Sequence, residues 1–402
     1  MEIDKLLWIG PYMTKEALDK AVEKGYLQVA ATLSQSYFLD GLENNFGKKI
    51  DILSAIRPPA FPTYKNVFVL KETIHHSDQI TGNNVGFLNI KYISHLSRQS
   101  SLLVSAKKWA NLNKDKSVRI IVYALHSPFL KAALKIKELV SDSEVIVIVP
   151  DLPLYMDMSS TIQRFLKRID WKKIKELILS IDKFVLFTKN MASYLGLPAN
   201  KWIVIEGLMD NSKIEDDSHA EKYDKNIVLY MGTLKKEYRI DTLVEAFKNI
   251  EQENLELHIY GNGDYKEELE KISEIHKNIK YCGYVSSDKA FNLMKKATLL
   301  VNPRPTKDEY TKYSCPSKTF EYMASGTPLL TTKLEGIPDE YFKYTYCFED
   351  ESVEGLRKKI QEVIKKGDDD LKETGYSAKE FIRNEKNNVV QTKKIMDFIR
   401  EI

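Results

Sequence analysis

The sequence has little cysteine. Its 402 residues include three, Cys282, Cys315 and Cys347, and their spacing is irregular. So small and odd a number excludes a disulfide framework as the source of stability and favours a reducing compartment. Long hydrophobic runs are also missing, because no stretch approaches the roughly 18 apolar residues of a transmembrane helix. The N-terminus, MEIDKLLWIG, carries early acidic residues and lacks the apolar stretch of a signal peptide. We therefore expect a cytoplasmic protein.

An excess of one charge sign is equally absent. The 60 Lys and Arg and the 57 Asp and Glu give a net charge of only +3, which argues against a nucleic-acid partner. No metal site is expected, since the seven histidines are scattered and His75 and His76 lack partners at ligand spacing. What remains is an ordinary globular composition in a chain long enough for two domains of roughly 200 residues each.

Short apolar runs alternate with helical patterns along the chain. Continuous runs rich in β-branched residues are typical of strands buried on both faces of a parallel sheet. Their alternation with helices predicts doubly wound α/β sheets. In the first half the predicted strands are 6–9, 49–53, 66–70, 118–123, 144–149, 183–187 and 202–205, and the predicted helices include 27–44, 91–112 and 127–140.

The composition changes at residues 211–226, which are polar and carry no apolar pattern. We interpret this stretch as a linker. The alternation then restarts, with predicted strands at 226–231, 255–260, 279–282, 298–302 and 328–332. The sequence thus predicts one Rossmann-like domain over 1–210 and a second over 226–385. In such sheets ligands bind beyond the carboxyl ends of the strands.

The most informative stretch is YSCPSKTFEYMASGTP, residues 313–328. A short helix is predicted over 318–325, entered at Pro316, with Ser317 as its N-cap. Gly326 is expected to end it in the left-handed conformation. The free N–H groups and the positive dipole at the start of this helix suit an anionic group such as a pyrophosphate.

Two charged residues strengthen this interpretation. Lys318 adds a point charge at the start of the helix. Glu321, about one turn later, is placed to accept hydrogen bonds from two adjacent ribose hydroxyls. The plain alternative is that Glu321 is a solvated helix residue.

The segment PSKTFEYMASGTPLL resembles the donor-binding segment of glycosyltransferase family 4. These are retaining GT-B enzymes, of the type found in bacterial capsular and exopolysaccharide synthesis. Further similar segments lie in the C-terminal domain: LYMGTL (229–234), RIDTLVEAF (239–247), IYGNGDYKEELEKI (259–272) and KYCGYVSSDKAFNLMKKATLLVNP (280–303). In the N-terminal half the resemblance is weaker.

The resemblance implies a GT-B fold, with two Rossmann-like domains facing across a cleft and a C-terminal helix, 386–402, that packs back on the N-terminal domain. It implies transfer of a sugar from a nucleotide-diphosphate sugar, expected to be a UDP-sugar, without a metal or other cofactor. The expected acceptor is a glycan or lipid-linked oligosaccharide.

The resemblance also implies the donor-binding residues. Glu321 would hold the ribose, and Pro316, Ser317, Lys318 and Thr319 the phosphates. Further candidates are Gly232, Thr233, Lys236, Arg239, Gly261 and, in the N-terminal domain, Gly25.

The sequence departs from the family at three of these positions. The family usually has two glutamates eight residues apart in this segment; Glu321 matches the second, and Tyr313 stands at the position of the first. An Arg and a Lys usual in the 232–239 loop are Thr233 and Tyr238. Lys235, Lys236 and Arg239 are the candidates to supply the missing charge.

Catalytic candidates are fewer. Asp151 follows the strand 144–149, at whose end much of the family has a histidine and this sequence has Pro150. Asp151 and His126, each just beyond a predicted strand, are candidates to contact the acceptor. Lys236, which is also a candidate to bind the donor phosphates, is the third catalytic candidate. The alternative for Asp151 is a structural role in its Pro-flanked turn.

Residues 162–181 have apolar side chains on one helical face and basic ones on the rest. With Trp171, this pattern predicts either a helix that binds the inner membrane surface or a helix packed on the sheet with a solvated basic face.

Three other functions stay open. The acceptor could be a protein, or the enzyme could be epimerase-like or phosphorylase-like. The chain could also be a non-catalytic nucleotide-sugar-binding subunit that supports a partner transferase.

Overall fold

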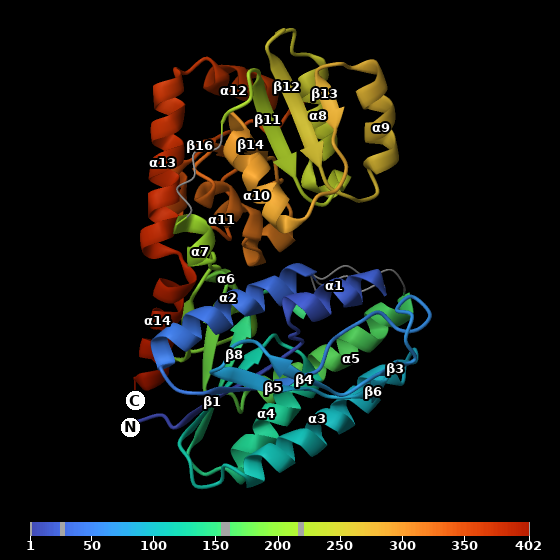
Figure 1. The fold of residues 1–402 in the computed structure, drawn as a ribbon, viewed down its shortest axis with the longest axis vertical. Helices are drawn as coiled ribbons and strands as arrows, with labels where there is room; N and C mark the ends of the chain where they lie inside the picture. Colours follow the sequence, from blue (N-terminus) through green and yellow to red (C-terminus); the bar gives the residue numbers. More distant parts are fainter. Residues whose placement is uncertain (1, 25–28, 154–160, 216–220, 402) are drawn as a thin grey trace. The chain divides into compact units, whose positions relative to one another are not determined.

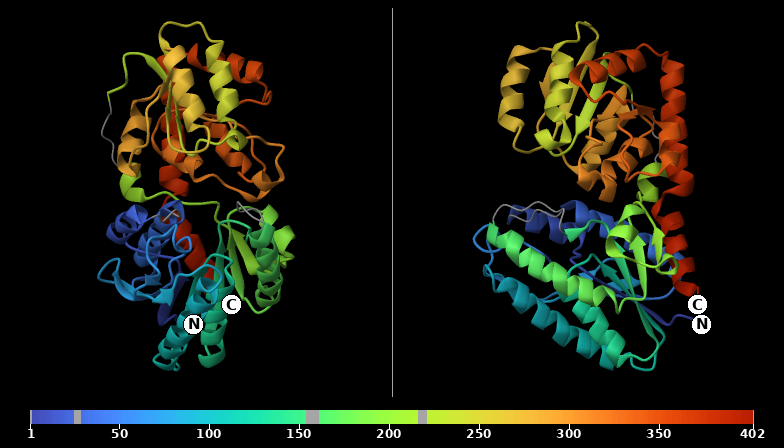
Figure 2. Two further views of the ribbon diagram at one scale, coloured as in Figure 1. Left: turned by 90° about the vertical axis from the view of Figure 1, so that its right-hand side faces the viewer. Right: turned by 180° about the vertical axis from the view of Figure 1, so that it is seen from behind.

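A computed structural model describes residues 2–24, 29–153, 161–215 and 221–401. The chain forms two compact units, one of Met1–Leu208 with Asn388–Ile402 and one of Met209–Asn387. Each unit has its own mainly parallel sheet with helices on both faces (Figures 1 and 2). The structure differs from the linker prediction, because helix α7 (Asn211–Glu215) belongs to the second unit and Ile214 is fully buried there. One apolar side chain in a polar stretch is enough to dock this single turn.

The first unit contains an eight-stranded sheet in the order β10-β9-β8-β7-β1-β2-β5-β4. All neighbours pair in parallel except β4, which is antiparallel to β5. The chain order reverses between β1 and β7. The strands are β1 (Lys5–Gly10), β2 (Ile50–Ser54), β4 (Glu72–His75), β5 (Ile80–Asn84), β7 (Val118–Tyr123), β8 (Ser143–Val149), β9 (Lys183–Leu186) and β10 (Trp202–Val204).

The helices of this unit lie on both faces of the sheet. One face carries α2 (Val29–Phe46) and α14 (Asn388–Arg400), whose apolar side chains share a core with the strands. The side chain of Asn45 on α2 donates to the carbonyl of Val389 at 2.8 Å and to Oγ1 of Thr392 at 2.9 Å. The remaining helices are α1 (Lys15–Glu23), α3 (Ser94–Asn111), α4 (Ser127–Leu139), α5 (Thr161–Ile178) and α6 (Asn190–Leu195).

The predicted buried strand at 66–70 is wrong. Only β3 (Phe68–Val69) forms, and it pairs antiparallel with β6 (Phe87–Leu88) in a separate two-stranded sheet. Phe68 and Leu70 are 62% and 69% exposed. A short apolar run does not by itself show which sheet it joins or whether both its faces are covered.

The second unit contains a six-stranded, fully parallel sheet in the order β13-β12-β11-β14-β15-β16. The chain adds strands outward from β11 and then returns to place β14 on its other side. The order therefore reverses between β11 and β14. The strands are β11 (Asn226–Met231), β12 (Leu255–Tyr260), β13 (Ile279–Tyr281), β14 (Leu299–Asn302), β15 (Leu329–Thr331) and β16 (Tyr346–Cys347).

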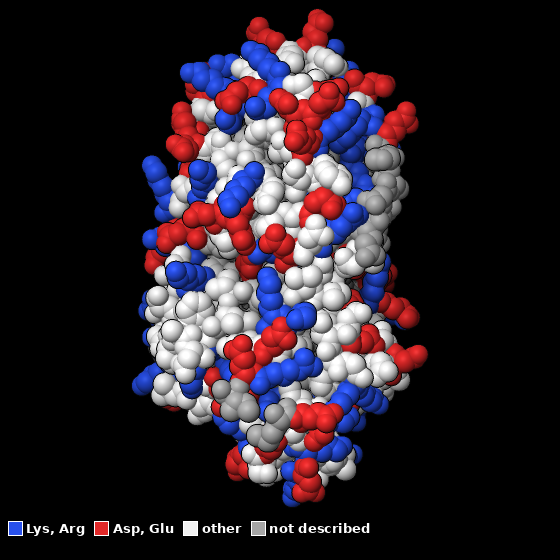
Figure 3. All heavy atoms as spheres, turned by 90° about the vertical axis from the view of Figure 1, so that its left-hand side faces the viewer, with Lys and Arg blue, Asp and Glu red and all other residues white. Residues whose placement is uncertain are grey.

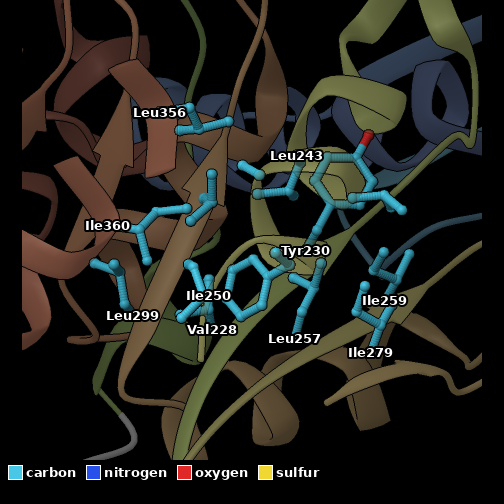
Figure 4. Close-up of a cluster of buried hydrophobic side chains, with 14 of the residues drawn as sticks. Val228, Tyr230, Leu243, Ile250, Leu257, Ile259, Ile279, Leu299, Leu356 and Ile360 are labelled. Atoms are coloured by element: carbon cyan, nitrogen blue, oxygen red, sulfur yellow. The ribbon is translucent and has the colours of Figure 1, made fainter. Parts of the chain in front are cut away.

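Two apolar cores cover the two faces of this sheet. One joins it to α8 (Ile240–Lys248), α9 (Lys266–Ile275) and α12 (Val353–Ile364). Figure 4 shows this core, where Val228, Leu257 and Leu299 of the strands meet Leu243 of α8 and Ile360 of α12. The other core joins the sheet to α10 (Ser287–Lys296), α11 (Ser317–Ala324) and α13 (Asp368–Glu385). The continuous apolar strands are thus buried on both faces, as predicted.

The surface of the molecule carries charged side chains of both signs (Figure 3). On the face drawn in Figure 3, Lys and Arg side chains are interspersed with Asp and Glu, and no broad area of one sign stands out. Within the described ranges, none of the helices combines the length and the apolar character that crossing a bilayer requires.

Candidate functional site

The loops after β11 and β12 run side by side at the carboxyl end of the second sheet. The N–H of Gly232 donates to the carbonyl of Tyr260 at 2.9 Å, and the N–H of Leu234 donates to Asn262 at 2.9 Å. A Cβ on Gly261 would lie 1.7 Å from the Gly232 carbonyl oxygen, and its φ is +145°. Because only glycine combines this backbone conformation with so close an approach, Gly261 brings the two loops together.

Two buried tyrosines fix helix α11 beside this edge. The Tyr322 hydroxyl of α11 accepts from the N–H of Met231 at 2.8 Å and donates to its carbonyl at 3.0 Å. The Tyr230 hydroxyl donates to the carbonyl of Thr233 at 3.0 Å. The exposed Thr233 therefore offers its side chain to solvent while its backbone is held. Helix α11, through Tyr322, and the loop after β11 are therefore both anchored to strand β11.

Helix α11 begins one residue earlier than predicted. Pro316 occupies the N-cap position, and no side chain caps the first turn. Ser317 is not the N-cap, because it is already the first helical residue. The N–H of Thr319 donates to Pro316, whereas no described residue accepts from the N–H of Ser317 or Lys318. Free N–H groups at a helix start attract anions. The other end is as predicted: the φ of Gly326 is +76°.

The Lys318 ammonium lies against the backbone of Gly232. A Cβ on Gly232 would be 2.3 Å from Nζ of Lys318. Burial lowers the pKa of Lys318 to about 8, Glu321 opposes this, and Arg304 lowers it further. Among the described residues, Lys318 has no ion-pair partner. A partly buried ammonium that makes no ion pair is a group that an anionic ligand would stabilise.

Glu321 lies one turn further along the same helix and is partly buried. Burial raises the pKa of its carboxyl group, while Lys318 and Lys213 lower it. No described residue donates a hydrogen bond to this carboxylate. Its acceptor capacity is therefore available for hydroxyl groups of a ligand.

Sequence reasoning missed Arg304, two residues beyond β14. Its guanidinium lies over the Tyr238 ring, 3.9 Å from the ring centroid. Its carbonyl accepts from Oγ1 of Thr332 at 2.5 Å. The only sequence signal was a cation two residues after the predicted strand 298–302, and Arg304 is not part of any motif quoted above.

The basic residues predicted to supply charge from the 232–239 loop are paired elsewhere. Lys235 binds Glu237 at 3.3 Å, and Lys236 binds Glu268 at 2.7 Å. Lys236 also lies over the Tyr265 ring. Arg239 donates to the carbonyl of Glu351 at 3.2 Å and approaches its carboxylate at 3.5 Å. The structure thus holds these three beside carboxylates, whereas it brings Lys318 to Gly232.

In the first unit, His126 directly precedes α4, just beyond β7. It is buried, and Nη2 of Arg98 lies 3.0 Å from its Nε2. Burial lowers the pKa of His126 well below the usual histidine range, and Arg57 and Arg98 lower it further. Asp151 is exposed just beyond β8. Gly25 lies outside the described residues.

The histidines are less scattered than the sequence suggests. The rings of His95 and His126 are 5.5 Å apart. A ring nitrogen of His95, a ring nitrogen of His126 and a carboxylate oxygen of Asp170 all lie within 4.8 Å of one another. Arg98 approaches His126, and the positive charges of Arg57 and Arg98 disfavour a cation there. Metal independence stays a prediction.

The predicted amphipathic helix 162–181 corresponds to α5. Its Trp171, Ile174 and Ile178 are buried, whereas Phe165 and Ile169 are 63% and 41% exposed. Trp171 packs against Tyr194 with ring centroids 6.0 Å apart. Trp171 is therefore not a surface anchor, and the second half of the helix fits the packed alternative.

Comparisons with known proteins agree with this architecture. Three solved structures share it over nearly their whole length. The structure of Anabaena HepE in complex with UDP has a TM-score of 0.65 and 12% sequence identity, and the match covers 99% of this chain and 100% of that one. Sucrose-phosphate synthase from Thermosynechococcus elongatus has a TM-score of 0.64 and 15% identity, with 98% of each chain covered. The lipopolysaccharide outer core galactosyltransferase WaaB has a TM-score of 0.64 and 15% identity, with 98% of this chain and 99% of that one covered. The fold is GT-B.

The second unit also matches a protein family. Residues 211–381 match the family described as glycosyl transferases group 1. No curated protein sequence matches the chain. The family match and the structural neighbours support a hexosyltransferase-type enzyme. The matched residues include Gly232, Gly261, Arg304, Lys318 and Glu321.

Proposed function

We propose that this protein is a retaining, metal-independent glycosyltransferase that takes a sugar from a UDP-sugar. The observation that carries the proposal is Lys318, held against the Gly232 backbone at the uncapped start of α11 and lacking an ion-pair partner among the described residues. Glu321 stands one turn away with its acceptor capacity unused. These groups suit a diphosphate next to a ribose. The UDP in the HepE structure supports the choice of nucleotide.

The reaction follows from these assignments. The acceptor hydroxyl oxygen bonds to the anomeric carbon of the sugar. The bond from that carbon to the diphosphate oxygen breaks, and its electron pair stays on the diphosphate, which takes up the hydroxyl proton. Lys318 and the N–H groups of α11 stabilise the charge that develops on this leaving group. Retention of configuration is inferred from the family resemblance, and proton NMR of the product's anomeric centre would test it.

The first experiment is thermal melting of the protein against UDP, GDP, ADP and their sugars, with EDTA present. A ligand at about 100 times its Kd adds about 2.7 kcal/mol, which raises Tm by a few degrees. We expect a selective shift with UDP and UDP-sugars. The absence of a shift with every nucleotide in a folded sample would contradict the proposal, and a shift that requires added metal would contradict its metal independence.

Substitution of Glu321 tests the ribose contact. Glu321→Ala should weaken UDP binding by roughly 1.5–3 kcal/mol, because a charged acceptor of hydrogen bonds is lost. The exposed Glu362→Ala on α12 is the control and should bind as the wild type does. Calorimetric titration measures both. Normal UDP binding by a folded Glu321→Ala protein would remove this assignment.

We propose a polysaccharide or lipid-linked oligosaccharide as the acceptor, in a bacterial envelope pathway on the cytoplasmic side of the membrane. Assays with lipid-linked sugars and with peptides would separate this function from protein glycosylation. Free sugar, sugar phosphate or an epimer as the product would indicate an epimerase-like or phosphorylase-like enzyme. Donor binding with turnover only after addition of a second protein would favour a supporting subunit.

We further propose peripheral membrane contact through the first half of α5. The exposed Phe165 and Ile169 stand beside the exposed basic residues Arg168 and Lys172, and apolar side chains flanked by positive charge suit an anionic lipid surface. Co-sedimentation with vesicles containing anionic lipid should fall for the double variant Phe165→Ser, Ile169→Ser. Equal binding of wild type and variant would exclude this contact.

A further inference from the structure

We propose that Arg304 binds the diphosphate of the donor and supplies positive charge that is not already paired with a carboxylate. The inference rests on the proposed function and adds a residue to the same site. The cations of the 232–239 loop, Lys235, Lys236 and Arg239, each lie beside a glutamate. Arg304 follows strand β14 and has no carboxylate partner among the described residues.

The position of Arg304 in the sheet is the first support. Strand β14 ends at Asn302, and β11, its neighbour, ends at Met231 (Figure 1). The strand order of the second unit reverses between these two strands. Ligands of such sheets bind beyond the carboxyl ends of the strands at this point. Gly232 and Arg304 follow the two strands that flank it.

The second support is how the side chain is held. Tyr238 lies under the guanidinium at 3.9 Å, a cation–π contact that orients the plane of the group. The Thr332 hydroxyl fixes the Arg304 backbone. None of the described side chains or carbonyls accepts from the guanidinium, which carries five N–H donors in a planar fork suited to phosphate oxygens. Tyr238 thus holds the Arg304 guanidinium in place.

The third support is the balance of charge around Lys318. Arg304 is close enough to lower the pKa of Lys318, so the two cations repel each other. Glu321 is the carboxylate that acts on Lys318, yet it forms an ion pair with neither cation in the described structure. In contrast, Lys235, Lys236 and Arg239 each lie beside a glutamate. Two partly buried cations that form no ion pair with any described residue match the two charged groups of a diphosphate.

A structural role for Arg304, as a clasp between the segment after β14 and Tyr238, is the alternative. It makes a different prediction. A clasp would affect every ligand of the site and the stability of the unit, whereas a diphosphate contact affects ligands only in proportion to their phosphate charge. The ligands UDP, UMP and uridine share one base and ribose and differ in that charge.

Calorimetric titration of the 402-residue chain with these three ligands is the test. We expect Arg304→Ala to weaken UDP binding roughly 10- to 100-fold, as for a lost charge-assisted hydrogen bond. UMP binding should weaken less, and uridine binding should stay unchanged. Arg304→Lys should recover part of the UDP affinity. The control is Arg357→Ala on α12, whose guanidinium pairs with Glu354 outside the site, and it should bind all three ligands normally.

Tyr238 provides a second variant. Tyr238→Phe keeps the ring and should keep UDP affinity, whereas Tyr238→Ala releases the guanidinium and should weaken UDP binding without affecting uridine. If Arg304→Ala bound UDP with wild-type affinity, or lost affinity for UDP and uridine equally, the role proposed for Arg304 would be overturned while the proposed function would still stand. A wild-type protein that binds no nucleoside diphosphate would instead overturn the proposed function and, with it, this inference.

Discussion

At the scale of single residues, the second unit carries charged side chains that form no ion pair with any residue that the structure describes. Lys318, Arg304 and Glu321 are partly buried, and the charges of Arg304 and Glu321 both act on the pKa of Lys318. By contrast, the buried Glu256 in the same unit is paired, because its carboxylate contacts Lys225, Lys280 and His258. Burial of a charge without a partner is costly. A bound ligand that pairs with Lys318, Arg304 and Glu321 would offset this cost at the sheet edge.

The lowered pKa of Lys318 predicts how binding depends on pH. Below pH 8 its ammonium form is populated and attracts the diphosphate, whereas above its pKa of about 8 the amine is neutral. UDP affinity should therefore fall as the pH rises from about 7 to about 9.5. Lys318→Arg should show a smaller fall, because arginine stays charged in this range. Calorimetry across the pH series measures both.

A matched control exists in the same unit. Burial also lowers the pKa of Lys222 to about 8, but its ammonium donates to the Ala297 carbonyl and the Thr327 hydroxyl. Lys222→Arg should keep the pH dependence of the wild type. If Lys318→Arg also kept it, Lys318 would not be the titrating group.

The sequence predicted part of this site. Lys318 and Glu321 could be predicted because helix start and helix spacing are local properties, and a short motif fixes both. Arg304 could not, since its relation to Tyr238 and Lys318 depends on which strands become neighbours. That Lys235, Lys236 or Arg239 binds the donor stays a prediction. The sequence did not show that each would lie beside a glutamate, since Glu351 comes from a distant segment.

At the scale of elements, strands with continuous apolar runs were predicted well, and those without were missed. Strand β5, ITGNN, has one large apolar residue, so the apolar pattern did not predict it. Its Gly82 packs so closely on β2 that a Cβ would lie 1.9 Å from the Ile52 carbonyl oxygen. Backbone fit, rather than side-chain pattern, places this strand. Conversely, the apolar run 66–70 was assigned to the main sheet, although its exposed Phe68 and Leu70 lie outside any core.

The contact between the two glycine loops predicts a sharp effect of one methyl group. Gly261→Ala should lower the free energy of unfolding by roughly 1–3 kcal/mol and weaken UDP binding, because the new Cβ would push the Gly232 carbonyl away. Gly283→Ala is the control: its φ is +78°, but a Cβ there meets nothing within 4 Å. Urea denaturation and UDP titration measure both properties.

The control separates backbone strain from the clash. Gly283→Ala carries the cost of a left-handed alanine without displacing a neighbour, so it should retain UDP affinity. Equal losses of affinity in the two variants would show that closeness to Gly232 is not what matters.

At the scale of the whole molecule, the first unit is made of two pieces of chain. Residues 209–387 form the second unit as an insertion, and the following α14 completes the first. Gln391 donates to the Gly207 carbonyl at 3.1 Å, and Asn45 of α2 binds the first turns of α14. Gly41 of α2 is needed here too, because a Cβ would lie 2.3 Å from the Asn388 carbonyl oxygen.

Removal of α14 should therefore damage the unit that is distant from it in sequence. A chain ending at Asn387 is expected to lose the first unit's thermal transition or show it at lower temperature, since Ile395, Met396 and Ile399 leave its core. UDP should still stabilise the second unit. Calorimetric scans resolve the two transitions, with a chain ending at Arg400 as the control. Destabilisation confined to the second unit would contradict this division.

The divided first unit also sets an order of events during synthesis. Domains commonly fold in the order in which they leave the ribosome. Here α2 is made early, but the helix that covers it emerges only after the whole of residues 209–387. For that interval the nascent chain presents the apolar side chains Phe38, Leu39 and Leu42 of α2 without the partners that α14 later brings. The inserted unit, whose sheet is complete before α14 appears, can reach its final form while the unit begun first is still waiting for its last helix.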